Sequence, residues 1–95
     1  MSVKPIVVIK DGILVPSGQV RTRTKGIEKL VEFAKNTENI QELAVIYSTT
    51  RDVASEVADA IGEFFPSEKI YITQLGSAVG VHAGPGVLGV GIREG

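Results

Sequence analysis

Short apolar runs alternate with two longer amphipathic stretches along this chain. The β-branched runs 6–9 and 13–15 flank Asp11-Gly12, a dipeptide typical of two-residue hairpin turns because both central positions need positive φ. Pro16 and Gly18 follow, and they are expected to end the second strand or to mark a bulge. The pattern therefore predicts that the chain opens with a β-hairpin.

A first helix is predicted by apolar residues at the i, i+3, i+4, i+7 spacing. These residues are Ile27, Leu30, Val31 and Ala34. Thr22 or Thr24 is a candidate N-cap, because a hydroxyl can accept a hydrogen bond from a free backbone N–H of the first turn. Asn36 or Asn39 is the candidate end of this helix.

The middle of the chain predicts a strand, a second helix and another strand. Residues 43–47 are continuously apolar, and the next apolar stripe is formed by Val53, Val57, Ile61 and Phe64. Thr49 with Asp52 suggests a capping box, and Pro66 is expected to close the helix. The three hydroxyl residues Ser48, Thr49 and Thr50 either cap this helix or bind an anion. Together with residues 70–73 these segments form a βαβ unit, whose crossover is right-handed if the strands are parallel.

The last predicted strand covers residues 87–92 and has one bare face. Gly89 and Gly91 alternate there with Leu88, Val90 and Ile92. We expect a helix or a ligand to pack directly against this backbone. The full order is β-β-α-β-α-β-β, which predicts a single-domain, two-layer α/β sandwich with a mixed sheet.

Composition excludes several classes of function. The 95 residues carry 10 basic and 11 acidic side chains, so no positive field exists to gather nucleic acid. The chain has no cysteine for disulfides or thiolate metal sites, and its start lacks the features of a signal peptide. We therefore expect a cytoplasmic protein without a metal, a cofactor or a membrane span.

Residues 70–92 contain no Asp, Glu, Lys or Arg, yet they hold the only histidine, His82. We expect no membrane helix here, because Gly84-Pro85-Gly86 would break it. Two interpretations of the glycines stand: a tightly packed turn between buried strands, or a loop whose backbone approaches a ligand. His82 is correspondingly either a hydrogen-bonded structural residue or a group beside that ligand.

Two arginines precede the first predicted helix, where the helix macrodipole disfavours cations. Arg21 and Arg23 are either solvated or face an anion together with free N–H groups. With His82 and the Gly84–Gly86 backbone they would suit a carboxylate or a phosphate. The chain has no nucleophile elbow, metal-ligand spacing or P-loop, so we assign no catalytic residue.

Several motifs, in order and over nearly the whole chain, resemble the C-terminal domain of DegV-family fatty-acid-binding proteins. They are Lys4-Pro5-Ile6, Asp11-Gly12, Val20-Arg21-Thr22-Arg23, Gly76, Gly80 and His82-x-Gly84-Pro85-Gly86-x-Leu88-Gly89. The pairing of the RTR and HxGPGxLG motifs is the specific part of this resemblance.

The resemblance implies a lipid carrier rather than an enzyme. In that family a long-chain fatty acid lies between two α/β domains, and some members present it to a separate fatty acid kinase. His82 and one arginine of the RTR motif, Arg21 or Arg23, would lie near the headgroup, and Gly84 and Gly86 would shape the turn that presents His82.

Two departures from the family bear on the site. Ala83 stands where a hydroxyl residue is usual, and nothing in this sequence resembles the N-terminal domain that supplies half of the tunnel. Half a tunnel would expose an apolar wall. We therefore expect a partner domain, a homo-oligomer or weak lipid binding; the alternative is an interaction domain that holds no lipid without a partner.

Overall fold

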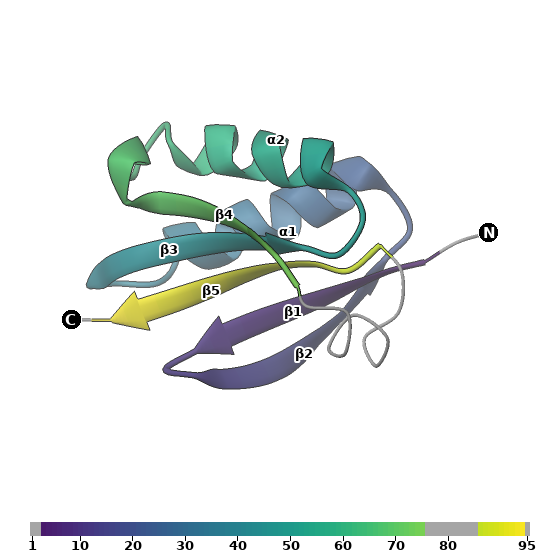
Figure 1. Cartoon of the computed structure of the whole chain (residues 1–95), viewed down its shortest axis with the longest axis horizontal. Coiled ribbons are helices and arrows are strands. Elements are labelled where there is room, and N and C mark those ends of the chain that lie inside the picture. Colours follow the sequence, from purple (N-terminus) through teal and green to yellow (C-terminus); the bar gives the residue numbers. More distant parts are fainter. Residues whose placement is uncertain (1–2, 76–85, 95) are drawn as a thin grey trace.

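The computed structural model describes residues 3–75 and 86–94, which form a five-stranded sheet and two helices (Figure 1). The strands are β1 (Lys4–Lys10), β2 (Ile13–Val20), β3 (Ile40–Tyr47), β4 (Ile70–Gln74) and β5 (Leu88–Glu94), and the helices are α1 (Arg23–Lys35) and α2 (Arg51–Ile61). A short 3₁₀ turn, Ser67–Lys69, leads into β4. This order confirms the predicted β-β-α-β-α-β-β arrangement.

The strand order across the sheet is β2-β1-β5-β3-β4. The last strand, β5, lies in the middle, parallel to β1 and antiparallel to β3. The β3-α2-β4 segment is a βαβ unit with parallel strands, as the sequence predicts. The sheet is therefore mixed.

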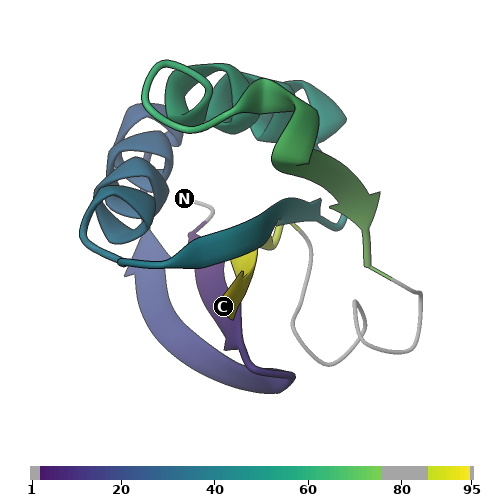
Figure 2. The same ribbon diagram turned by 90° about the vertical axis from the view of Figure 1, so that its left-hand side faces the viewer.

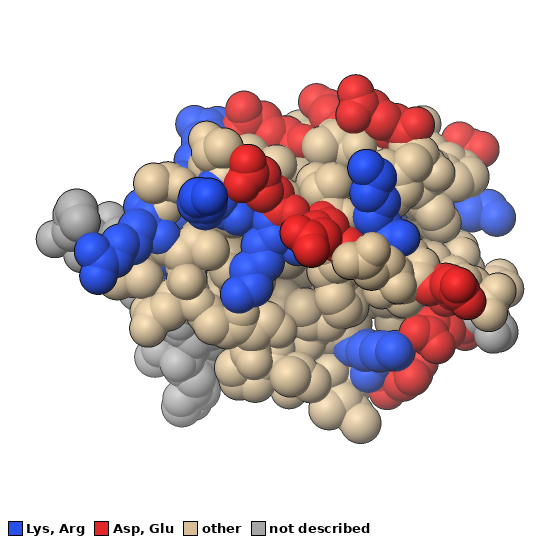
Figure 3. All heavy atoms as spheres, turned by 180° about the vertical axis from the view of Figure 1, so that it is seen from behind, with Lys and Arg blue, Asp and Glu red and all other residues tan. Residues whose placement is uncertain are grey.

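Both helices cover the same face of the sheet, which makes the two-layer sandwich visible from the end of the molecule (Figure 2). The core between the layers is apolar and is formed by Ile6, Leu30, Leu43, Val45, Val57, Ile61, Leu88 and Val90, among others. Seen from behind, charged side chains gather mainly over the upper, helical half of the molecule (Figure 3). Within the described residues, no helix is long and apolar enough to cross a membrane.

The opening hairpin has the predicted turn. Asp11 and Gly12 both adopt positive φ, at 53° and 80°. The register of β1 against β2 is irregular between Pro5 and Val7, opposite the region of Pro16, so the predicted bulge is present. The strand nevertheless continues past Pro16 to Val20, because proline is tolerated on a sheet edge, where its missing N–H removes no ladder bond to an outer neighbour.

The ends of α1 follow the sequence, whereas those of α2 do not. Thr22 caps α1 by accepting a hydrogen bond from the Lys25 amide at 3.1 Å, and Asn36 ends it. The predicted Thr49–Asp52 capping box is wrong, because the N-cap of α2 is Thr50 and its side chain makes no capping bond.

The end of α2 also comes earlier than predicted. Its C-cap is Gly62, four residues before the Pro66 that was expected to close it. Glycine is a poor helix former, so the helix ends at Gly62, before the chain reaches Pro66. Phe64 is consequently exposed rather than part of the apolar stripe of α2.

The bare face of β5 is filled by side chains of the neighbouring strands. An ideal Cβ on Gly89 would lie 2.5 Å from both Val7 Cγ2 and Val7 O, whereas one on Gly91 would lie 3.4 Å from Ile46 Cδ1. Our expectation that a helix or a ligand packs there is thus corrected: Val7 and Ile46 occupy the space above the two glycines. Both side chains are buried although no helix lies on their face of the sheet.

The two glycines of β5 should respond differently to alanine. Gly89→Ala forces a methyl group against the Val7 backbone and should lower the free energy of unfolding by about 1–3 kcal/mol, typical of overpacking. Gly91→Ala places its methyl group at ordinary contact distance and should change stability by less than about 0.5 kcal/mol. Urea denaturation of both variants checks this, and equal losses would contradict the packing described for Val7.

Candidate functional site

One end of the sheet collects most of the described candidate residues. Val20, the last residue of β2, pairs with Lys4, the first residue of β1, and Leu88 pairs with both Ile6 and Tyr47. The end of β2, the start of β5 and the end of β3 therefore lie together. Both helices also begin at this end, and we call it the loop end of the sheet.

Arg21 stands at the loop end in the bend between β2 and the N-cap of α1. Its side chain is exposed, and among the described residues it makes no hydrogen bond or ion pair. A guanidinium in this position can offer its planar fork of donors to a carboxylate or a phosphate. Arg21 thus fits the predicted role by geometry, and that role stays a prediction.

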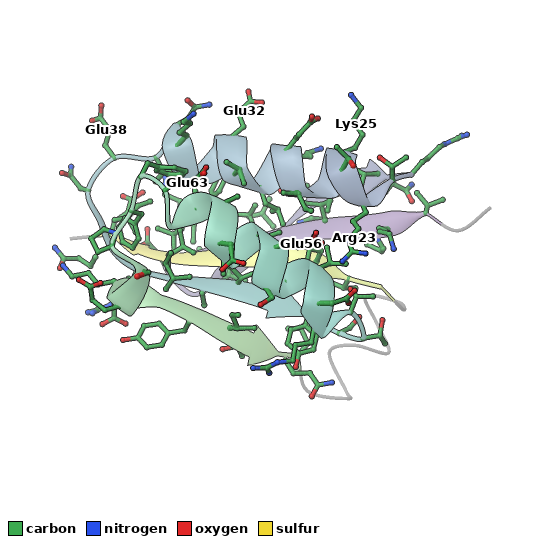
Figure 4. The ribbon with its side chains drawn as sticks, turned by 90° about the horizontal axis from the view of Figure 1, so that it is seen from above. Arg23, Lys25, Glu32, Glu38, Glu56 and Glu63 are labelled. Carbon is green, nitrogen blue, oxygen red and sulfur yellow. The ribbon has the colours of Figure 1, made fainter. Side chains whose placement is uncertain are left out.

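Arg23, in contrast, is engaged with α2. It is the first residue of α1, and its guanidinium donates to Asp52 at 2.9 Å and to Glu56 at 2.5 Å. Figure 4 shows Arg23 and Glu56 meeting between the two helices. The carboxylates offset the unfavourable macrodipole that a cation meets at a helix N-terminus.

The electrostatics of this ion pair are those of a surface contact. The side chain of Arg23 is 47% exposed, and its partners are at least as open to solvent. The hydrogen bond to Glu56 raises the pKa of Arg23 above its usual value, so the guanidinium stays charged. Two of its five N–H donors are committed to the carboxylates of α2, which leaves Arg21 as the better placed of the two arginines for an external anion.

Gly86 is the one glycine of the predicted GPG turn that the structure describes. It adopts φ +75° immediately before the buried Val87 that leads into β5. This left-handed conformation favours glycine over residues with a side chain. His82, Gly84, Gly76 and Gly80 lie outside the described residues, so their predicted roles stay predictions.

Ser48 is a residue of the loop end whose role the sequence did not reveal. Its hydroxyl accepts a hydrogen bond from the Val87 amide at 2.9 Å, and its own amide donates to Val87 O at 3.1 Å. Gln74 Nε2 donates to Ser48 O at 3.1 Å. The sequence offered Ser48 only as one of three hydroxyls that cap a helix or bind an anion.

The sheet face opposite the helices is uncharged over most of its width. Ladder partners share a face, so this open face carries Val7, Ile9, Leu14, Ala44, Ile46, Tyr71, Gly89 and Gly91. Tyr71 is 51% exposed and Leu14 is 41% exposed. A hollow of about 200 Å³ on this face is lined by Ile9, Ala44, Tyr71 and Gly91, and the ion-paired Glu42 and Arg93 also line it.

This arrangement provides a polar end joined to an apolar surface. The hollow begins about three residues along the strands from the Tyr47–Leu88 pair, a distance of roughly 10 Å. Among the described residues no group of His, Cys, Asp and Glu could hold a metal ion. The geometry suits a ligand with one anionic group and an apolar body.

Comparison with known proteins decides the family. A family model described as "Uncharacterised protein, DegV family" matches residues 1–95. The chain belongs to the DegV family. The family resemblance noted in the sequence is thereby confirmed.

Relatives and a solved structure agree with this membership. A DegV domain-containing protein of Streptomyces coelicolor is 32% identical over 93 residues, and Protein DegV of Bacillus subtilis is 27% identical over 93 residues. Each alignment covers 95% of this chain, which spans about a third of the length of these relatives, 33% in both cases.

A fatty acid binding DegV family protein from Streptococcus agalactiae has a crystal structure with the same fold. The TM-score is 0.66 at 23% sequence identity, over 83% of this chain and 28% of that chain. The mixed sheet and two helices of this DegV-family chain therefore correspond to part of the longer Streptococcus agalactiae protein.

The Arg23 ion pairs should contribute a salt-dependent increment to stability. Arg23→Gln removes the contacts to Asp52 and Glu56 and should lower the urea midpoint slightly at low ionic strength. The difference should shrink in about 1 M NaCl, where charges several ångströms apart are screened. Arg21→Gln is the matched control and should leave the midpoint unchanged; equal shifts in both variants would contradict the assignment of Arg23 to α2.

Proposed function

We propose that this chain is a fatty-acid-binding module, one part of a carrier completed by a further domain. The observation that carries the proposal is the uncharged open face, which runs from the loop end to the hollow around Ile9, Ala44 and Tyr71. A long acyl chain would bury this apolar surface, a favourable transfer from water. The fatty acid binding protein of the same fold supports this ligand class.

The carboxylate of the fatty acid would lie at the loop end. Arg21 would pair with it, Gly86 would let the backbone approach it closely, and His82 and Gly84 complete the set that the sequence assigns. Arg23 would act by holding α1 against α2 and so fixing the segment that carries Arg21. The residues in this proposal bind and orient a ligand, and none of them breaks a bond, so the chain is a carrier and not an enzyme.

The missing half of the binding site would come from another domain. This chain spans about a third of the length of its relatives, and Tyr71 and Leu14 are exposed on the open face. An N-terminal DegV-like domain, or a second copy of the chain, would cover that face and enclose the lipid. The assembled carrier would work in the cytoplasm and present the fatty acid to a separate fatty acid kinase.

A second candidate function is a protein-interaction domain that holds no lipid without its partner. The exposed apolar residues of the open face favour it as well, since such a face suits a partner protein. The two functions differ in whether the isolated chain takes up a fatty acid.

Replacing Arg21 should separate recognition of the carboxylate from burial of the acyl chain. We expect Arg21→Gln to weaken palmitate binding by about tenfold or more, the loss typical of a charge-assisted hydrogen bond, and His82→Ala to weaken it as well. Methyl palmitate, which lacks the anionic group, should bind wild type and Arg21→Gln equally. Displacement of a fluorescent fatty acid measures each affinity.

Lys25→Gln is the matched control for this experiment. Lys25 lies in the first turn of α1, its side chain is exposed, and its contact is a long one to Glu28 at 3.9 Å. Its replacement changes the net charge equally and should leave the palmitate affinity unchanged. Equal losses in both variants, or equal binding of palmitate and its methyl ester by wild type, would contradict the proposed carboxylate site.

A further inference from the structure

The end of β4 and the start of β5 lie on opposite sides of the end of β3. In the sheet β3 lies between these two strands, parallel to β4 and antiparallel to β5. The chain therefore leaves β4 at Gln74 on one side of β3 and returns on the other side at Val87. Neighbouring strands lie about 4.8 Å apart, so the two ends of this connection are held roughly 10 Å apart.

Tyr47, the last residue of β3, and Ser48, the residue after it, bond to both of these ends. On the β4 side, the Leu75 amide donates to Tyr47 O at 2.8 Å and Gln74 Nε2 donates to Ser48 O at 3.1 Å. On the β5 side, Ser48 and Val87 exchange two hydrogen bonds. All three polar groups of Ser48 are thus used, one toward β4 and two toward β5.

The hydroxyl of Ser48 replaces a backbone group in this arrangement. Residues directly opposite in an antiparallel ladder can exchange both N–H···O bonds through their backbones. Ser48 follows the Tyr47–Leu88 pair and faces Val87, yet the Val87 amide bonds to Ser48 Oγ rather than to Ser48 O. The Ser48 carbonyl is thereby left to accept from Gln74.

A side chain without an oxygen at position 48 would remove the acceptor of the Val87 amide. Without the hydroxyl, the buried Val87 amide would lose its acceptor unless the peptide turned toward the Ser48 carbonyl, which already accepts from Gln74. The peptide that joins Gly86 to Val87 carries this amide, and Gly86 stands in the positive-φ conformation. The Ser48 hydroxyl therefore fixes the orientation of that peptide.

We infer that Ser48 is a positioning residue for the ligand-binding loop end: its hydroxyl holds the Gly86–Val87 peptide while its carbonyl holds Gln74. The inference rests on the proposed function, because it assigns Ser48 an effect on fatty acid affinity through Gly86. Ser48 itself touches no ligand in this account. The Ser48 hydroxyl is therefore required for fatty acid binding. The hydroxyl of the neighbouring Thr49 is exposed and is not required.

The test compares Ser48→Thr with Ser48→Val in the full 95-residue chain. The two new side chains match in shape, and only threonine keeps the oxygen. Ser48→Val should weaken palmitate binding by roughly five- to tenfold, the factor for a lost hydrogen bond to a buried donor, whereas Ser48→Thr should stay near wild type. Thr49→Ala, the hydroxyl control, should bind palmitate like wild type.

A second control separates positioning from general stability. Ile61→Val removes one methylene from the core at the far end of α2 and should lower the urea midpoint with no loss of palmitate affinity. If Ser48→Val weakens binding no more than Ile61→Val does, or binds like Ser48→Thr, the inference is overturned.

Amide hydrogen exchange tests the same inference without lipid. The Val87 amide should exchange at least about tenfold faster in Ser48→Val than in Ser48→Thr, while the Val90 amide within β5 stays unchanged. If wild type takes up no palmitate, the proposed function fails, and the Val87 exchange rate alone then decides whether Ser48 holds this peptide. Equal Val87 exchange in the two variants overturns the inference in either case.

Discussion

The sheet depends on the insertion of its last strand between two parts of the chain that otherwise share no ladder. The β1–β2 hairpin and the β3-α2-β4 unit are each local in sequence, and β5 pairs with β1 on one side and β3 on the other. Gly89 makes this insertion possible, because any side chain there would meet Val7. Among the described strands, the ladders of β5 are therefore what joins these two parts into one sheet.

The same constraint gathers the candidate site. Because β5 is parallel to β1, the start of β5 lies beside the start of β1, and the end of β2 lies there through the hairpin. Arg21 and Gly86, far apart in sequence, come to one end of the sheet for this reason. The antiparallel pairing with β3 adds Ser48 to that end. The polar residues proposed to bind a carboxylate are therefore a consequence of the strand order.

Much of the fold could be predicted from the sequence because its signals are local. Asp11-Gly12 fixed the hairpin turn, and the helical stripes located both helices. The wrong predictions concern places where two nearby residues or two bonding partners could each have served. Gly62 ended α2 before Pro66, and the Ser48 hydroxyl bonded across the sheet instead of capping a helix. No periodicity shows which of several adjacent hydroxyls will lie opposite Val87, since that depends on the register between β3 and β5.

The candidate site was less accessible to prediction than the fold. The arginines of the RTR motif look equivalent in sequence, and they differ only because α2 brings Asp52 and Glu56 beside Arg23. An exposed apolar wall was expected from the family resemblance, but its residues could not be predicted, because strand order decides that Ile9, Ala44 and Tyr71 surround one hollow.

The central claim is that the loop end and the open face together hold a fatty acid. Native mass spectrometry of the protein purified from bacteria, followed by denaturing extraction of lipids, tests it most directly. The account predicts a stoichiometric fatty acid adduct on the chain or its dimer. A lipid-free protein that also takes up no added palmitate would contradict the claim and leave the interaction-domain function in its place.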